Sequence, residues 1–233
     1  MPRLSEEAIR RVLLWLTLAV GLLTAAGVFS VFWSQIPLDD FHLAEARESF
    51  VRLFALDREA NVPTWFSSSI LLASAAFLGW IAMNRRARQA SFWRHWATLA
   101  FVFLFMSLDE TAQIHEMLTR PTSQLFDFGG VLYFSWVVPA GILMLVFGVV
   151  YLRFLRALPA ETRNLFLLSG AVFLLGSLGM ESVSALFATQ HGKASVAYGL
   201  ATSAEEFLEM AGIVIFLKAL MEYPPLYGPS ESA

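Results

Sequence analysis

The chain has 233 residues, of which 57% are hydrophobic and 15% are charged, and its formal net charge is −3. A soluble domain is usually about 25% charged, so this composition argues against an ordinary soluble protein, and no basic run suggests a nucleic-acid partner. The chain contains no cysteine, which excludes disulfide bonds and thiolate metal ligands.

The apolar residues are organised into six runs, each long enough to cross the ~30 Å hydrocarbon core of a bilayer as a helix. The first run is longer than the ~7–15 apolar residues of a signal peptide, so we interpret it as a retained span. The sequence therefore predicts an all-α integral membrane protein, with six transmembrane helices in one bundle and residues 1–233 forming a single polytopic domain. The expected spans are about 12–33, 64–84, 96–117, 131–152, 165–187 and 197–217.

Lysine and arginine residues in short loops set the orientation of a membrane protein, because cytoplasmic loops carry more of them. Most of these residues lie before the first span, between the second and third, between the fourth and fifth, and at the end of the sixth. We therefore expect both termini in the cytoplasm, and we expect the protein in the bacterial inner membrane.

The segment between the first two spans is too polar to cross a membrane, yet it has a helical pattern. Phe50 and Phe54 fall on one face, with acids and arginines elsewhere, which predicts an amphipathic helix at about 40–58 in the outer interface. Asn61 is expected to cap the following helix, and Pro63 suits its first turn.

The third span ends in "SLDETAQIHE", an unusual run of polar residues directly after a strongly apolar stretch. At 100° per residue, Asp109, Gln113 and Glu116 fall within about 60° of one another on one helix face. Glu110 and His115 flank that face on opposite sides. The predicted orientation places this face in the outer half of the membrane.

The fifth and sixth spans also carry acids at a comparable depth. Each span aligns its acids with small or hydroxyl-bearing residues, which allow close helix approach, while Glu206 points away from the main stripe of the sixth span. The stripes consist of Ser177, Glu181 and Ser184 in the fifth span, and of Tyr198, Thr202, Glu205 and Glu209 in the sixth.

An ionised carboxylate in the middle of a membrane costs at least ~2.5–3.5 kcal/mol and normally faces the interior of a helix bundle. No lysine or arginine lies inside a predicted span to neutralise these acids. The acids must therefore share protons, bind cations or line a water-filled cavity. We expect the three acidic faces to converge on one site that opens outward.

Carboxylates and imidazole without thiolates favour hard or borderline divalent metals. We therefore expect a divalent metal ion (Fe, Mn or Zn), although the Glu-x-x-His pairs of ferritin-like di-metal sites are absent from the sequence. The expected metal ligands are Asp109, His115, Glu116, Glu181, Glu205 and Glu209, with Glu110, Gln113, Tyr198 and Glu206 as a second tier.

Three functions fit such a site. The inner halves of the spans, such as "FVFLFM" and "IVIFLKAL", offer few polar groups between the acids and the cytoplasm, which favours an enzyme acting from the outer side on a lipid or other apolar substrate. The alternatives are a cation- or proton-coupled transporter, and a non-catalytic subunit or sensor with a protonated carboxylate network. The pattern leaves the catalytic residues, the substrate and the oligomeric state open.

Overall fold

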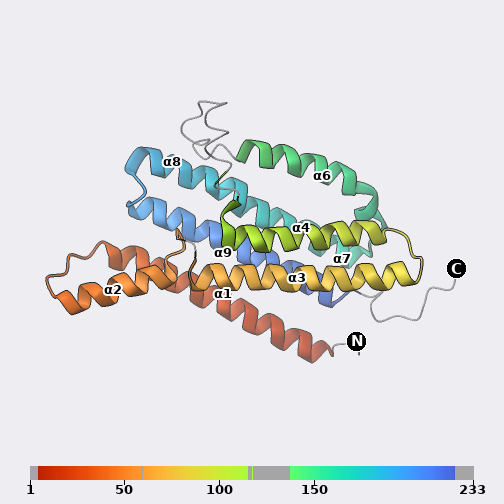
Figure 1. The fold of residues 1–233 in the computed structure, drawn as a ribbon, viewed down its shortest axis with the longest axis horizontal. Helices are drawn as coiled ribbons and strands as arrows, with labels where there is room; N and C mark the ends of the chain where they lie inside the picture. Colours follow the sequence, from red (N-terminus) through yellow and green to blue (C-terminus); the bar gives the residue numbers. More distant parts are fainter. Residues whose placement is uncertain (1–4, 59, 115–116, 118–136, 224–233) are drawn as a thin grey trace.

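The computed structural model describes residues 5–58, 60–114, 117 and 137–223, and every regular element within these ranges is a helix (Figure 1). The all-α fold class is therefore confirmed. The elements are α1 (Glu6–Ser34), α2 (Phe41–Phe54), α3 (Val62–Ala87), α4 (Trp93–Ala112), α6 (Val137–Ala157), α7 (Ala160–Leu174), the π-helix η2 (Leu175–Met180), α8 (Glu181–His191) and α9 (Val196–Met221).

Within the described ranges, four helical segments are long and apolar enough to cross a membrane. They correspond to the first, second, fourth and fifth predicted spans, so the chain has the features of a multi-pass membrane protein. The predicted third and sixth spans, α4 and α9, are helical but are not among the four, and both carry acidic side chains. The four segments are Glu6–Ser34, Val62–Ala87, Val138–Ala157 and Ala160–His191.

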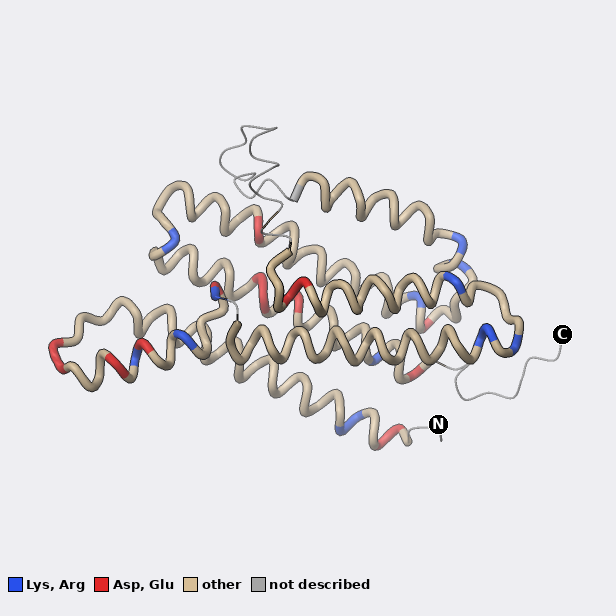
Figure 2. Tube along the Cα trace, in the orientation of Figure 1, with Lys and Arg blue, Asp and Glu red and all other residues tan. Residues whose placement is uncertain are grey.

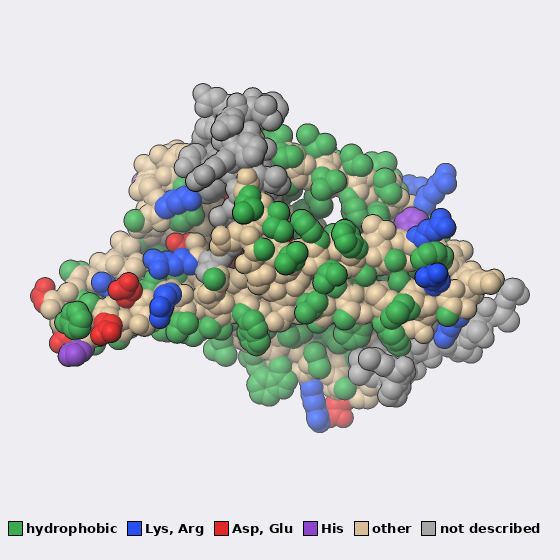
Figure 3. All heavy atoms as spheres, viewed as in Figure 1, with side chains coloured by type: hydrophobic (Ala, Val, Ile, Leu, Met, Phe, Trp, Pro, Cys, Tyr) green, Lys and Arg blue, Asp and Glu red, His purple; other side chains and the backbone are tan. Residues whose placement is uncertain are grey.

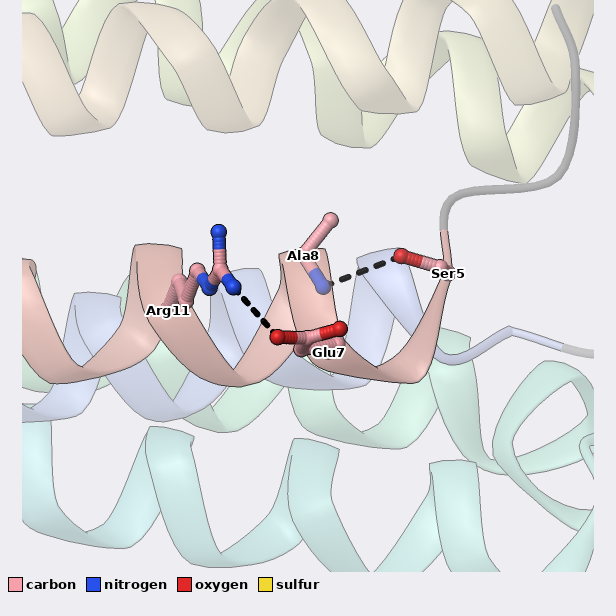
Figure 4. A network of polar contacts seen from close by, with 4 residues as sticks. All are labelled: Ser5, Glu7, Ala8 and Arg11. Atoms are coloured by element: carbon pink, nitrogen blue, oxygen red, sulfur yellow. Dashed lines mark hydrogen bonds and ion pairs between the residues drawn. The ribbon is translucent and has the colours of Figure 1, made fainter.

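Helix α1 begins before the first apolar run, because polar residues complete its first turn (Figure 4). The hydroxyl of Ser5 accepts a hydrogen bond from the backbone N–H of Ala8 at 3.1 Å, which is the usual role of an N-cap residue. Glu7 and Arg11 form an ion pair one turn apart, and both side chains are largely exposed. The helix consequently starts at Glu6 rather than near residue 12.

The amphipathic helix α2 lies where the sequence places it, although it is shorter than the predicted 40–58. Asp40 caps it by accepting a hydrogen bond from the backbone N–H of Leu43 at 2.9 Å. The ring of Phe50 lies 5.5 Å from the rings of both Phe29 and Trp33, which attaches α2 to α1. No residue of α2 is buried, so the rest of the described structure leaves it largely uncovered.

The start of α3 agrees with its predicted cap. The side chain of Asn61 accepts a hydrogen bond from the backbone N–H of Thr64 at 3.0 Å, and Pro63 occupies the first turn. The α3 helix then packs along α4 through most of its length (Figure 1).

Helix α9 is the central element, since it packs against α1, α3, α7, η2 and α8. Two of its glycines permit these close approaches. A Cβ atom on Gly199 would lie 2.7 Å from the side chain of Val31, and one on Gly212 would lie 2.9 Å from the backbone N of Phe173. Small residues of this kind allow membrane helices to pack with their backbones close together.

The half of the bundle that we predict to face the cytoplasm has an aromatic core. The ring of Phe216 lies 4.5 Å from Phe103 and 4.7 Å from Phe166, and thereby joins α9 to α4 and α7. Trp96 continues this core with ring contacts at 4.9 Å to Tyr223 and 5.1 Å to Phe154. These aromatic residues fill the space between the acidic residues and the inner end of the bundle.

Helix α6 is attached to the bundle mainly through its C-terminal half, where Tyr151 and Phe154 are buried, as is Leu158 directly after the helix. In contrast, Leu145 and Val149 are 73% and 69% exposed. Figure 3 shows an opening between α6 and α4 on the face drawn there. Hydrophobic side chains surround this opening (Figure 3).

Candidate carboxylate site

A buried carboxyl group lies at the contact between α8 and α9. Glu205 is only 9% exposed, and its Oε2 atom accepts a hydrogen bond from the hydroxyl of Ser184 at 3.2 Å. Ser184 is fully buried, and its hydroxyl also lies 3.0 Å from the backbone carbonyl of Glu181. A polar group buried in this way needs such a partner, because an unsatisfied one is costly.

Glu181, the first residue of α8, forms a side-chain hydrogen bond with Glu205. Two carboxyl groups can bond to each other only if one of them carries a proton, because ionised carboxylates are acceptors alone. A single proton shared between the two helices would meet this requirement. In a low-dielectric setting, this arrangement avoids placing two adjacent negative charges together.

Two further acids of α9 surround this pair. Glu206 and Glu209 both lie close enough to act electrostatically on Glu205, and both side chains are half-buried. Glu209 also lies close to the π-helix, because a Cβ atom added to Gly176 would be only 3.0 Å from the Cγ atom of Glu209. These four acids, Glu181, Glu205, Glu206 and Glu209, are called the carboxylate cluster below.

The π-helix η2 sets the position of Glu181. The backbone N–H of Glu181 bonds to the carbonyl of Gly176, five residues earlier, so the turn before the acid is wider than an α-helical turn. A Cβ atom on Gly176 would lie only 2.8 Å from the carbonyl oxygen of Glu205, which shows how closely η2 approaches α9. Short π-helical segments occur frequently at functional sites.

The sequence predicts a regular α-helix through this segment and gives no indication of the π-helix. The only signal was the pair of glycines in "GSLGM", which weakens α-helical structure without specifying a π-turn. Ser177, predicted to lie on the acidic stripe, donates its hydroxyl hydrogen bond to the backbone carbonyl of Phe173 at 3.2 Å.

The end of α4 is tied to α3 by a reciprocal pair of hydrogen bonds. The hydroxyl of Ser68 donates to the carbonyl of Ser107 at 2.8 Å, and the hydroxyl of Ser107 donates to the carbonyl of Ser68 at 2.9 Å. These bonds lie directly before Asp109 and Glu110, whose side chains are half-buried. They fix the position of the two acids of α4 along the length of α3.

The register between α4 and α9 brings the acids of α4 to the level of the carboxylate cluster. The two helices run in opposite directions, and Phe103 stacks on Phe216. Seven residues make almost two full helical turns, so positions seven residues apart lie on the same helix face. We count seven residues forward from Phe103 along α4 and seven residues back from Phe216 along α9. Those positions are Glu110 and Glu209. Figure 2 shows the acids of α4, α8 and α9 in the same part of the molecule.

The predicted third span continued to residue 117, but α4 ends at Ala112. Gln113 adopts a left-handed conformation with φ 56°, and its N–H bonds to the carbonyl of Asp109 at 2.8 Å, which closes the helix. Asp109 and Gln113 therefore do not lie on one continuous α-helical face. The predicted ligands His115 and Glu116 lie outside the described residues.

Within the described ranges, no group of three or more His, Asp or Glu side chains is arranged to hold a metal ion. Of the six predicted ligands, the structure brings Glu181, Glu205 and Glu209 together, and the α4 register places Asp109 near their level. The second-tier Tyr198 is buried two turns before Glu205 on α9. His191 ends α8 and is exposed.

The comparison with protein families covers nearly the whole chain. Residues 10–222 match the model of a family described as "Domain of unknown function (DUF8692)". The chain belongs to this family. The matched range includes every described member of the carboxylate cluster, so the cluster lies inside the family's domain. No curated protein and no solved structure matches the chain.

Proposed function

We propose that this protein is a six-span protein of the bacterial inner membrane, with both termini in the cytoplasm and α2 in the outer interface. The four apolar segments support this arrangement. Because α9 is packed against α1, α3 and α7, which all belong to those segments, α9 is expected to cross the membrane with them. Helix α4, the predicted third span, packs against α3 in the same way and is expected to cross the membrane as well.

We propose further that the protein is a metal-dependent enzyme that acts on a lipid or other apolar substrate from the outer side. The observation that carries this proposal is the hydrogen-bonded pair of Glu181 and Glu205 at the contact of two helices. A divalent cation can take the place of the shared proton, because both carboxyl groups then serve as ligands. The metal would be Fe, Mn or Zn, with Glu209 as a further ligand and with Asp109, His115 and Glu116 as candidates.

Such a site supports two kinds of chemistry. A bound metal ion lowers the pKa of a water ligand and polarises a substrate oxygen. A neighbouring carboxyl group such as Glu206 can accept or donate the proton during the reaction. The opening between α6 and α4 (Figure 3) gives an apolar substrate a lateral route from the lipid toward this level of the bundle.

The experiment that tests this function uses detergent-purified protein supplied with Fe²⁺, Mn²⁺ or Zn²⁺ and a total lipid extract. Mass spectrometry then follows the bound metal and the consumption of each lipid. We expect metal-dependent conversion of one lipid class by the wild-type protein and its loss in Glu205→Gln, which keeps the shape of the side chain but removes its charge.

The matched control is Glu222→Gln. Glu222 is an acid at the inner end of α9 that pairs with Lys218, so its substitution should change neither metal content nor turnover. Wild-type protein that binds no metal, converts no lipid and melts at the same temperature with chelator and with every metal would contradict the enzyme. That result would favour the non-catalytic, protonated network.

A cation- or proton-coupled transporter is the second candidate, and the π-helix favours it. Transporters often place their ion sites beside interrupted helices, and η2 interrupts the α-helical fifth span directly before Glu181. Proteoliposomes with an enclosed pH-sensitive or metal-sensitive dye would report such transport. Flux across the membrane by the wild-type protein, lost in Glu205→Gln, would favour the transporter over the enzyme.

A further inference from the structure

A cavity of about 320 Å³ lies at the opposite end of the bundle from the carboxylate cluster. Its walls include Arg85, Phe92, Trp96, Phe154 and Tyr223. The cavity is formed where the ends of α3 and α9 meet the beginning of α4 and the end of α6. Its volume falls within the range of small-molecule binding pockets.

The charged group of this cavity is held in a fixed orientation. The Nε atom of Arg85 donates to the carbonyl of Ser91 at 3.1 Å, and its Nη1 atom donates to the hydroxyl of Tyr223 at 3.0 Å. No hydrogen bond between described residues uses Nη2, and no carboxylate in the described ranges pairs with Arg85. A planar, preorganised guanidinium of this kind suits a phosphate group.

Two helix N-termini open at the same cavity. Phe92 is the N-cap residue of α4 and Pro159 is that of α7, and neither supplies a side-chain hydrogen bond to the first turn of its helix. Free N–H groups and the helix dipole both favour an anion at such a position. The two termini therefore add to the positive potential that Arg85 supplies.

The charges around the cavity are mostly positive. Figure 2 shows basic residues, all of them arginines, at the turns between α3 and α4 and between α6 and α7. Among the acids of this end, Glu161 lies in the first turn of α7 and Glu222 pairs with Lys218, and neither lines the cavity. The orientation predicted from the arginines places this end at the cytoplasmic face of the membrane.

We propose that this cavity binds the phosphate of an anionic phospholipid from the inner leaflet. Arg85 and the two helix N-termini hold the phosphate oxygens, while the rings of Trp96 and Phe154 contact the glycerol backbone and the first acyl carbons. A free inorganic phosphate has the same charge chemistry but no group for these apolar walls. The choline of a zwitterionic lipid would meet the surrounding arginines, so phosphatidylglycerol should be preferred to phosphatidylcholine. This proposal is independent of the carboxylate cluster and its function.

Native mass spectrometry of delipidated, detergent-purified protein tests this proposal by counting bound lipids. Phosphatidylglycerol, phosphatidylcholine and inorganic phosphate are titrated separately, and phosphate is also added in excess over phosphatidylglycerol. Wild-type protein should retain one tight phosphatidylglycerol. Arg85→Gln should weaken it at least about tenfold, the effect of losing a charged hydrogen-bonding partner.

A second variant guards against a folding defect in Arg85→Gln. Ala157 lines the cavity and is exposed, so Ala157→Trp fills the space without removing Arg85 and should weaken the same lipid. The control is Arg88→Gln, which removes an exposed arginine close to Arg85 that does not line the cavity, and it should retain the lipid.

Three results would overturn the assignment. Equal binding of phosphatidylglycerol and phosphatidylcholine would show that the site does not select an anion. If Arg88→Gln lost phosphatidylglycerol as readily as Arg85→Gln, binding would depend on the general surface charge and not on the cavity. Displacement of phosphatidylglycerol by inorganic phosphate would show that the site takes a free anion and no lipid.

Discussion

The hydroxyl of Ser184 donates a hydrogen bond to Oε2 of Glu205 across the contact of α8 and α9, at 3.2 Å. The serine is fully buried and the glutamate nearly so. Because Glu181 bonds to the same carboxyl group, one acid of the central helix is held from two positions on α8. The hydrogen bonds of this site therefore also hold α8 and α9 together.

Replacing Ser184 with alanine should destabilise the protein, because a buried carboxyl group loses one of its hydrogen-bond donors. The expected cost is about 1–3 kcal/mol, seen as a lower melting temperature in detergent. Ser182→Ala is the matched control, since the Ser182 hydroxyl bonds to the carbonyl of Leu178 one turn earlier in the same span. Equal melting temperatures for the two variants would contradict this role of Ser184.

Replacing Gly176 with alanine should disturb the contact of η2 with α9. The added Cβ atom would lie 2.8 Å from the carbonyl oxygen of Glu205, and overpacking of this kind costs about 1–3 kcal/mol. Gly170→Ala is the control in the same span, where nothing lies within 4 Å of the added atom. We expect a lower melting temperature for Gly176→Ala alone, and a neutral result there would argue against the close approach.

The register of α4 against α9 predicts that Glu110 and Glu209 face each other. The chain has no cysteine, so the double variant Glu110→Cys, Glu209→Cys can be treated with thiol crosslinkers without background reactions. We expect an intramolecular crosslink with a bifunctional reagent that is long enough to join two helices connected through their side chains. Leu108 is 55% exposed, and the control pair Leu108→Cys, Glu209→Cys should not crosslink. Crosslinking of the control pair at the same rate would refute the register.

The predicted orientation places Arg88 in the cytoplasm and Glu48 outside. Both side chains are exposed, so single cysteines at these positions should react equally well in permeabilised cells. In intact cells, an impermeant thiol reagent should label only Glu48→Cys. Labelling of Arg88→Cys from outside would reverse the topology and place the carboxylate cluster in the inner half of the membrane.

The sequence was informative where local rules decide the structure. Helix starts such as that at Asn61 follow from capping chemistry, and apolar periodicity was sufficient to predict the helices, including α2. Each of these features depends on residues within one helix, so no knowledge of the partners was needed.

Features that depend on two helices at once were not accessible in this way. The π-turn at Gly176 is stabilised by packing against Glu205 of another helix, and no local pattern distinguishes it from an α-turn. The end of α4 at Ala112 depends on a left-handed Gln113, a conformation that non-glycine residues adopt only with local support. The α-helix of the third span therefore ends earlier than the predicted residue 117.

The central claim is that Glu181 and Glu205 form one intramembrane site that exchanges a shared proton for a divalent metal ion. Calorimetric titration of the purified protein with Mn²⁺ or Zn²⁺, repeated in buffers of different ionisation enthalpy, measures metal binding and proton release together. We predict that the wild-type protein releases protons as it binds the metal and that Glu205→Gln does neither, whereas Glu222→Gln behaves as the wild type. Absence of metal binding in the wild type, or binding that Glu205→Gln leaves unchanged, would contradict the claim.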